Sequence, residues 1–357
     1  MKTSLVTTMK ARRALRARRL QLMGFLAVII TCTSALSAGR GRPPLARYML
    51  DSQTLNFSEF ISRNEGYVYL MFFNAAYVDF VKSWICNVRL FEENTVERTL
   101  FVASDQQSAA HLQSLDPAIF VHVSPALHEA QTYGTYGYFR LTLERLLIQN
   151  ALLQAGINVF VIEPDAVWLS PVSSYLSNIL VQNALVSAND RGPSKPLISA
   201  GFLYVKSTER DFFEHYVSRY SLLLSKYKNS KGSIDHVEPG EQHLMTRLLR
   251  KSRSNSVFWL DECLFARGEW YSDSSYRDAC PHPLVIQNNY IRGIDSKVSR
   301  AQQWGHWFLS SDGECARPGF FKSSSPKFSK SRLKRNLSVS KLLGSGLLAE
   351  EGNLVQS

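Results

Sequence analysis

The stretch Ala155 to Pro171 reads A-G-I-N-V-F-V-I-E-P-D-A-V-W-L-S-P and decides the fold of this chain. Its centre, residues 158–162, is an apolar run with the length of a buried strand. A glycine, the residue type that commonly ends a helix, precedes the run, and two carboxylates one residue apart follow it, Glu163 and Asp165. The stretch therefore predicts a buried strand that follows a helix and ends in two acidic side chains.

Apolar strands and amphipathic helices alternate before this stretch as well. The predicted strands and helices are, in chain order, 67–73, 78–90, 99–105 and 139–155. Strands buried on both faces and joined by helices are typical of an α/β domain with a mostly parallel sheet. Ligands bind outside the carboxyl ends of such strands, so we expect Asn74, Asp105, Glu163 and Asp165 on one edge of the sheet.

The two carboxylates at the strand end have two interpretations. A pair separated by one residue can bind one divalent cation, and a cation held in this way can bridge a diphosphate. Pro164 between them restricts the backbone. Glu, Pro and Asp are also common at an ordinary junction of strand and turn. The local residues alone leave both interpretations open.

The chain of 357 residues has a formal charge of +11, but the excess cations lie at its two ends. Ten Lys and Arg precede Asp51, the first acidic residue, and residues 322–357 add seven cations against two Glu. Residues 51–321 therefore carry a formal charge of about −4. A globular composition, 45% hydrophobic, with an acidic centre argues against a nucleic-acid-binding protein.

An uncharged apolar run, residues 22–38, follows the N-terminal arginines. Cations before such a run and few after it are typical of a signal anchor that leaves the N-terminus in the cytosol. We predict a cytoplasmic basic tail at 1–21, an anchor at 22–38 and a stem at 39–66. Because a membrane span needs ~17–25 residues, a cleaved signal ending near Ser37 is the alternative. The folded domain is expected at 67–321, before a basic, Ser-rich and disordered tail at 322–357.

The cysteines outside the apolar run are even in number, which suits disulfides in an exported domain: Cys86, Cys263, Cys280 and Cys315. Three pairings are possible. We expect Cys263 to pair with Cys280, since the short polar loop between them closes at modest entropic cost. No C-x-x-C or H-x-x-x-H spacing supports a zinc site. Asn56 and Asn336 begin glycosylation sequons, which are used only if these regions are exported.

Five motifs occur in one order along the chain. They are W-I-C-N (84–87), the stretch 155–171, I-S-A-G-F-L-Y-V-K-S-T (198–208), E-Q-H-L-M-T-R-L-L (241–249) and V-I-Q-N-N-Y-I-R-G-I-D-S-K (285–297). In this order they resemble the nucleotide-diphospho-sugar transferases related to glycosyltransferase family 77, whose central motif is G-y-n-V-l-x-x-D-x-D-x-V-W-l-x-x-P. The resemblance covers about residues 67–309. Each motif alone is weakly specific, and the ordered set is strongly specific.

The resemblance implies a GT-A fold, which is Rossmann-like, in a single-pass type II Golgi membrane protein with a lumenal catalytic domain. Such an enzyme moves a sugar from a nucleotide diphosphate sugar, usually a UDP-sugar, to a glycan or glycoprotein acceptor. The resemblance also implies Mn²⁺ or Mg²⁺ on Glu163 and Asp165, with Gln287 at the position of a further ligand. The expected partners are the donor, the acceptor and the membrane, and no nucleic acid.

Further roles are carried over from the family position by position. The donor-binding positions are Asn74, Arg140, Asp165, Asn288, Gly293 and Lys297, and the catalytic positions are Asp190, Glu241 and Gln242. Lys297 would neutralise the leaving diphosphate. Three of these residues also have simpler interpretations. Glu241 would complement a helix dipole, Arg140 would pair with Glu144 in one helix, and Lys297 would be a solvated loop lysine.

The chain departs from the family pattern at four polar positions. Glu163 and Glu241 replace Asp, Ser199 replaces Asn, and Gln287 replaces a His. A neutral amide oxygen is a weaker ligand for Mn²⁺ than imidazole. The alternative hypothesis is therefore a catalytically silent lumenal protein with the same fold that binds a glycan or a protein partner.

Overall fold

The computed structural model describes residues 60, 64, 66–124, 131, 134–229, 234, 240–252 and 256–316. The predicted anchor at 22–38, both sequons and the tail at 322–357 lie outside the described residues. Within these ranges, no helix is both long enough and apolar enough to cross a membrane.

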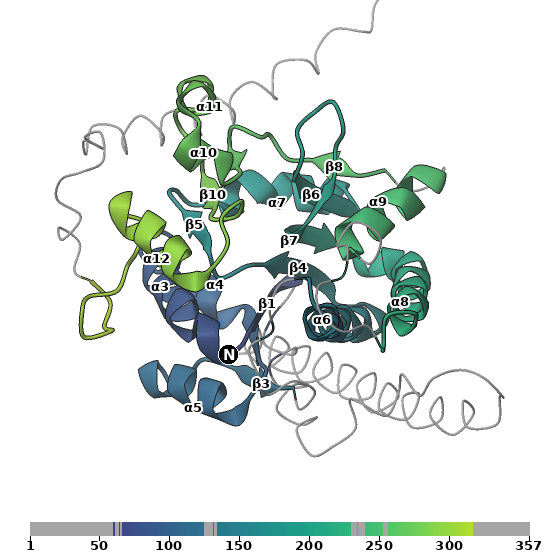
Figure 1. The fold of residues 1–357 in the computed structure, drawn as a ribbon, viewed down its shortest axis with the longest axis horizontal. Helices are drawn as coiled ribbons and strands as arrows, with labels where there is room; N and C mark the ends of the chain where they lie inside the picture. The colour runs from purple at the N-terminus through teal and green to yellow at the C-terminus, as the bar shows by residue number, and fades with distance from the viewer. Residues whose placement is uncertain are drawn as a thin grey trace, which may run out of the picture. The chain divides into compact units, whose positions relative to one another are not determined.

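A seven-stranded sheet with the order β3-β2-β1-β4-β7-β6-β8 forms the centre of the described part (Figure 1). Strands β3, β2, β1 and β4 are parallel, β7 is antiparallel to both β4 and β6, and β8 is parallel to β6. The strands are β1 (Tyr67–Phe73), β2 (Thr99–Ala103), β3 (Val121–Val123), β4 (Asn158–Ile162), β6 (Leu185–Asn189), β7 (Ile198–Val205) and β8 (Phe258–Trp259). The predicted α/β class with a mostly parallel sheet is confirmed, and β7 makes the sheet mixed.

A second, three-stranded sheet has the order β5-β10-β9. Its strands are β5 (Ala166–Trp168), β9 (Phe265–Ala266) and β10 (Val285–Gln287). The chain passes from the large sheet to the small one through residues 163–165, because β4 ends at Ile162 and β5 begins at Ala166. The two predicted acidic residues thus lie at the junction of the two sheets.

Helices cover both faces of the large sheet (Figure 1). One face packs against α3 (Val78–Val88) and α7 (Ser173–Gln182), whose apolar side chains share a buried cluster with strand residues such as Phe160 and Phe202. On the other side lie α6 (Tyr136–Gln154), α8 (Arg210–Ser225) and α9 (Glu241–Lys251). The shorter elements are η2 (Ala75–Tyr77), α4 (Glu93–Glu97), α5 (Gln106–Leu115), η3 (Ser207–Glu209), α10 (Glu269–Ser272), α11 (Ser274–Ala279) and α12 (Ile294–Gln303).

The local sequence explains the helix and strand around the acidic pair. Thr135 accepts a hydrogen bond from the Tyr138 backbone and caps α6, which therefore begins three residues before the predicted start at Phe139. The backbone of Gly156 has φ +82°, a conformation that glycine adopts without strain, so the chain turns there into β4. The strand predicted at 158–162 is confirmed at both ends.

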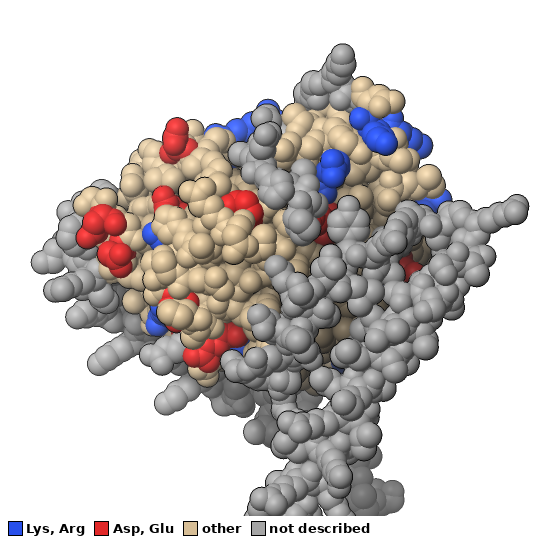
Figure 2. All heavy atoms as spheres, turned by 90° about the horizontal axis from the view of Figure 1, so that it is seen from below, with Lys and Arg blue, Asp and Glu red and all other residues tan. Residues whose placement is uncertain are grey.

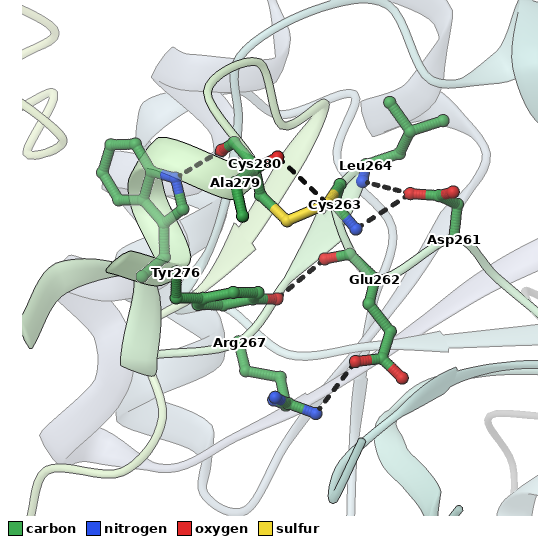
Figure 3. Close-up of a disulfide and its surroundings, with 9 residues drawn as sticks. Asp261, Glu262, Cys263, Leu264, Arg267, Tyr276, Ala279 and Cys280 are labelled. Atoms are coloured by element: carbon green, nitrogen blue, oxygen red, sulfur yellow. Dashed lines mark hydrogen bonds and ion pairs between the residues drawn. A yellow bond between two sulfur atoms is a disulfide. The ribbon is translucent and has the colours of Figure 1, made fainter. Parts of the chain in front are cut away.

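Two disulfides join the cysteines of the described part. The predicted pair Cys263 and Cys280 is confirmed, and Cys86 pairs with Cys315 across 229 positions of sequence. Figure 3 shows the Cys263–Cys280 bond beside Tyr276, whose hydroxyl donates to the Glu262 carbonyl at 2.8 Å. This hydrogen bond ties the disulfide loop to the residue that precedes Cys263.

The charged surface of the described part is mixed on the face in Figure 2. Acidic side chains lie mostly on the left of this view with a few basic atoms beside them, basic side chains gather at the upper right, and most of the visible described surface is uncharged. No continuous basic stripe crosses the described surface on this face, in agreement with the mildly acidic centre of the sequence.

Candidate active site

The carboxyl ends of four strands meet at one edge of the large sheet, where the candidate site lies. Because β6 runs in the same direction as β1, β2 and β4, this edge carries the four residues Asn74, Asp105, Glu163 and Asp190. Asp105 serves the fold, since its carboxylate caps α5 by accepting from the Ser108 backbone at 2.7 Å. The three other residues are candidates for contacts with a ligand.

Asp165 forms a nearly buried ion pair with Lys297. The Lys297 Nζ lies 2.5 Å from the Asp165 Oδ2, and the two side chains are 15% and 3% exposed. Burial acts to lower the pKa of Lys297, but Asp165, Tyr77 and Glu163 together outweigh it and the pKa is raised. Gly293, with φ +89°, precedes α12 and leads the chain to Lys297. The sequence analysis placed both residues in the donor site, and the structure brings them together.

Glu163 belongs to a second charged cluster that the sequence analysis did not foresee. Arg145 on α6 lies between two carboxylates, with a guanidinium nitrogen 3.8 Å from Glu163 Oε1 and another 3.3 Å from Glu241 Oε1. Loss of surrounding water and the charge of Asp165 raise the pKa of Glu163, and Arg145 and Lys297 oppose that rise. Two cations and three carboxylates thus form one network at the sheet edge.

Gly201 on β7 provides the space for the Glu163 side chain. A Cβ atom added to Gly201 would lie 2.4 Å from both Cδ and Oε2 of Glu163. The Glu163 backbone also donates to the Gly201 carbonyl at 3.1 Å, so the two residues are fixed against each other. The A-G-F motif therefore requires glycine at position 201, because the Glu163 side chain lies too close to the backbone there for a Cβ atom.

We expect Gly201→Ala to displace the Glu163 carboxylate and to lower kcat/KM on the order of tenfold or more, because small misplacements of catalytic groups are costly. A double-mutant cycle in thermal unfolding with Glu163→Ala checks the cause. Gly201→Ala should destabilise the wild-type chain and leave the Glu163→Ala chain almost unaffected. Equal destabilisation in both backgrounds would contradict the proposed contact.

Asp190 follows β6 and is held by three side chains from two segments. Asn289 Nδ2 donates to its Oδ1 at 3.1 Å, and the Tyr290 hydroxyl donates to its backbone carbonyl. The Gln242 amide donates to its Oδ2 at 3.3 Å in the orientation that also lets the amide oxygen accept from the Ala200 backbone at 3.0 Å. Burial, and then the charge of Glu163, raise the pKa of Asp190 to about 7.

We expect Asp190→Asn to stabilise the fold at pH 8. The folded-state pKa is raised above the unfolded value, so the contribution of Asp190 to stability is present at low pH and is lost as the pH rises through about 7. The melting temperature of the variant should exceed that of the wild type at pH 8, and the gap should close toward pH 4. A gap that widens on acidification would reverse this sign and overturn the assignment.

Gln287, the third predicted metal ligand, is buried, and its side-chain oxygen already accepts a hydrogen bond. Ser199 Oγ donates to Gln287 Oε1 at 3.1 Å, so two of the positions that depart from the family pattern contact each other. The described residues contain no cluster of three or more His, Cys, Asp and Glu side chains able to hold a metal. The oxygen atoms of Glu163, Asp165 and Gln287 are of the type that a hard cation binds, and the Lys297 ammonium contacts one oxygen of Asp165 in this structure.

The remaining predicted residues divide into two groups. Asn74 is 8% exposed and its Oδ1 is buried with no hydrogen-bond partner, which fits a residue that awaits a ligand. Asn288 is buried and donates to the Lys297 carbonyl at 3.0 Å, so it orders the loop that leads to Lys297. Arg140, in contrast, is exposed at the start of α6.

The cation that the structure places among the carboxylates is Arg145, which the sequence analysis missed. A signal for it was present in the helix pattern. Arg145 lies three residues after Thr142 and four before Gln149, and both of these are buried. A lone cation on the buried face of a helix indicates a paired carboxylate.

This chain is similar to a known family and to several known proteins. Residues 94–301 match the family model described as nucleotide-diphospho-sugar transferase. The chain is 23% identical over 269 residues to UDP-D-xylose:L-fucose alpha-1,3-D-xylosyltransferase 3 of Arabidopsis thaliana, an alignment that covers 70% of this chain and 68% of the relative. It is 24% identical over 200 residues to UDP-galactose:fucoside alpha-3-galactosyltransferase of Dictyostelium discoideum, with 51% of this chain and 30% of the relative covered.

Among solved structures, mouse xyloside xylosyltransferase 1 in its apo form is similar to this chain with a TM-score of 0.41 and 14% identity. That similarity covers 63% of this chain and 98% of the mouse protein.

Proposed function

This chain belongs to the nucleotide-diphospho-sugar transferase family and is a glycosyltransferase, and we propose that its donor is a UDP-sugar and its acceptor a fucoside on a glycan or glycoprotein. The donor and the acceptor rest on the named relatives. One relative uses UDP-xylose and another UDP-galactose, and both names specify fucose or a fucoside as the acceptor. Because these two relatives differ in donor sugar and share the type of acceptor, they support a fucoside as the acceptor of this chain.

The observation that carries the proposal is the ion pair of Lys297 with Asp165 at the edge of the sheet. Lys297 is a flexible point charge that can exchange the carboxylate for a phosphate oxygen of the donor. Asn74 has a buried, unpaired oxygen at the same edge, where a nucleoside hydroxyl or amine can donate to it. These groups together are suited to contacts with a nucleoside diphosphate.

We assign the donor sugar to the space near Glu163, Asp190 and Glu241. Arg145 keeps Glu163 and Glu241 at fixed positions, and Gln242 fixes one oxygen of Asp190. Carboxylates held in this way can accept hydrogen bonds from sugar hydroxyls. A divalent cation on Glu163 and Asp165, with Gln287 nearby, would stabilise negative charge as the nucleotide leaves.

For the location, we propose a lumenal site behind the predicted anchor at 22–38, in the GT-A arrangement that the motifs suggest. The two disulfides among the described cysteines support an oxidising compartment. Two measurements would test the orientation: whether the two sequons carry glycans, and whether the domain is protected from protease in sealed microsomes.

The test of the proposed function is the binding of UDP to the purified full-length chain by calorimetry, with and without Mn²⁺. A screen for hydrolysis of UDP-xylose, UDP-galactose and other UDP-sugars follows on the same material. Binding of UDP and hydrolysis of one donor would support the proposal. A cooperatively folded chain that binds neither UDP nor GDP would overturn it and favour the catalytically silent alternative.

A further inference from the structure

Tyr290 has a backbone conformation that its residue type disfavours. Its φ is +58°, the one positive φ at a non-glycine residue among the residues that the structure describes. For a bulky side chain this conformation is strained, and such strain concentrates at functional sites. The residue is 52% exposed, so burial of its ring does not account for the strain.

Neighbouring groups hold the loop around Tyr290 in this conformation. The side chain of Asn289 accepts from the Gly268 backbone at 2.5 Å, and the Asn289 carbonyl accepts from Arg300 at 2.6 Å. A Cβ atom on Gly268 would lie 2.0 Å from that carbonyl oxygen, so this position requires glycine. The surrounding structure thus forces the backbone of Tyr290 into place.

The tip of the Tyr290 side chain is fixed while much of the residue stays exposed. Its hydroxyl donates to the backbone carbonyl of Asp190 and lies 3.4 Å from the Asp190 Oδ1. Asp190 in turn contacts Gln242, which the family resemblance places among the catalytic positions. The ring therefore stands beside the candidate sugar site with an apolar surface open to solvent.

We propose that the ring of Tyr290 is the platform for the acceptor sugar. This inference rests on the proposed function and adds a residue and a contact to it. A pyranose presents C–H groups on one face, and a fixed aromatic ring offers the matching apolar surface at a low cost in conformational entropy. The hydroxyl of Tyr290 links the position of this platform to Asp190. Residues 288–297, which run from a loop into α12, also include Lys297, so one segment carries both the contact to Asp165 and the proposed acceptor platform.

The variants that test this are Tyr290→Ala, Tyr290→Phe and Tyr290→Gly in the full chain. Saturation-transfer NMR measures binding of methyl α-L-fucoside, and of galactoside and xyloside for comparison, to the UDP-loaded protein. We expect Tyr290→Ala and Tyr290→Gly to weaken fucoside binding on the order of tenfold, with UDP affinity retained. Tyr290→Phe keeps the ring and loses its anchor, so it should show an intermediate loss. Phe258→Ala, which removes another exposed aromatic ring on β8, is the matched control and should not change fucoside binding.

Thermal unfolding separates this role from a structural one. Tyr290→Gly removes the backbone strain and should melt no lower than Tyr290→Ala, although fucoside binding is weakened in both. Glycoside binding that persists in Tyr290→Ala would overturn the inference, and so would the absence of any glycoside binding to the UDP-loaded wild type. If UDP itself does not bind, the proposed function fails, and the glycoside titrations without UDP still decide whether Tyr290 contacts a sugar.

Discussion

Replacing Asp165 with Asn is expected to lower the free energy of unfolding by about 3–5 kcal/mol and to abolish UDP binding. The substitution leaves the ammonium group of Lys297 in a largely buried position without its carboxylate partner. A buried charge that loses its partner is strongly destabilising, whereas replacement of both partners by neutral groups is often tolerated. The largest effect on both stability and binding should therefore arise at this pair.

The double variant Asp165→Asn with Lys297→Met separates the two effects. It removes both charges, so chemical denaturation should show that most of the lost stability is regained. Nucleotide binding should stay absent, because neither the carboxylate nor the ammonium is available to the donor. Recovery of UDP binding together with stability would mean that the ion pair serves the fold alone.

Removal of Arg145 is expected to have the second largest effect. In Arg145→Met, Glu163 and Glu241 lose the cation that lies between them, and we expect a loss of about 3 kcal/mol in stability and a large loss of transfer activity. Two ionised carboxylates without a cation between them repel each other, and protonation at low pH relieves that repulsion. The deficit in stability should consequently be smaller at pH 5 than at pH 8, as measured by urea denaturation at both values.

Two further variants control for the loss of Arg145. Arg145→Met with Glu241→Gln removes one of the two carboxylates and should regain part of the stability at pH 8. Arg140→Met removes an exposed cation from the same helix and should change stability by no more than about 0.5 kcal/mol. Loss of UDP binding in Arg140→Met would support the role that the sequence resemblance gave Arg140, and normal binding would leave that role to Arg145.

The regular elements around the acidic pair were predictable because their signals are local. The strand at 158–162 is a continuous apolar run, and Gly156 ends the preceding helix where a glycine was expected to end it. The Cys263–Cys280 disulfide was predictable for a similar reason, since a 17-residue separation favours closure. The antiparallel direction of β7 had no such signal, because a fully buried strand has the same apolar pattern whether it lies parallel or antiparallel to its neighbours.

The charged network was predicted only in part, since its contacts are long-range. Arg145 and Glu241 are 96 residues apart in sequence, and nothing near either residue identifies the other as its partner. The contact of Ser199 with Gln287 joins two departures from the family pattern that looked independent in the sequence. The strain at Tyr290 is likewise imposed by neighbours, among them Gly268 and Arg300, so its own sequence gives no turn signal.

The Cys86–Cys315 bond makes a covalent ring of most of the described chain. The ring encloses residues 94–301, the whole segment that matches the family, and in the chain-entropy model a loop of this length stabilises a fold by about 5 kcal/mol. A protease that cuts a surface loop inside the ring leaves two fragments that remain covalently joined. In a compartment rich in proteases, such a nicked transferase would keep its mass on a non-reducing gel and would separate into fragments only when the bond is reduced.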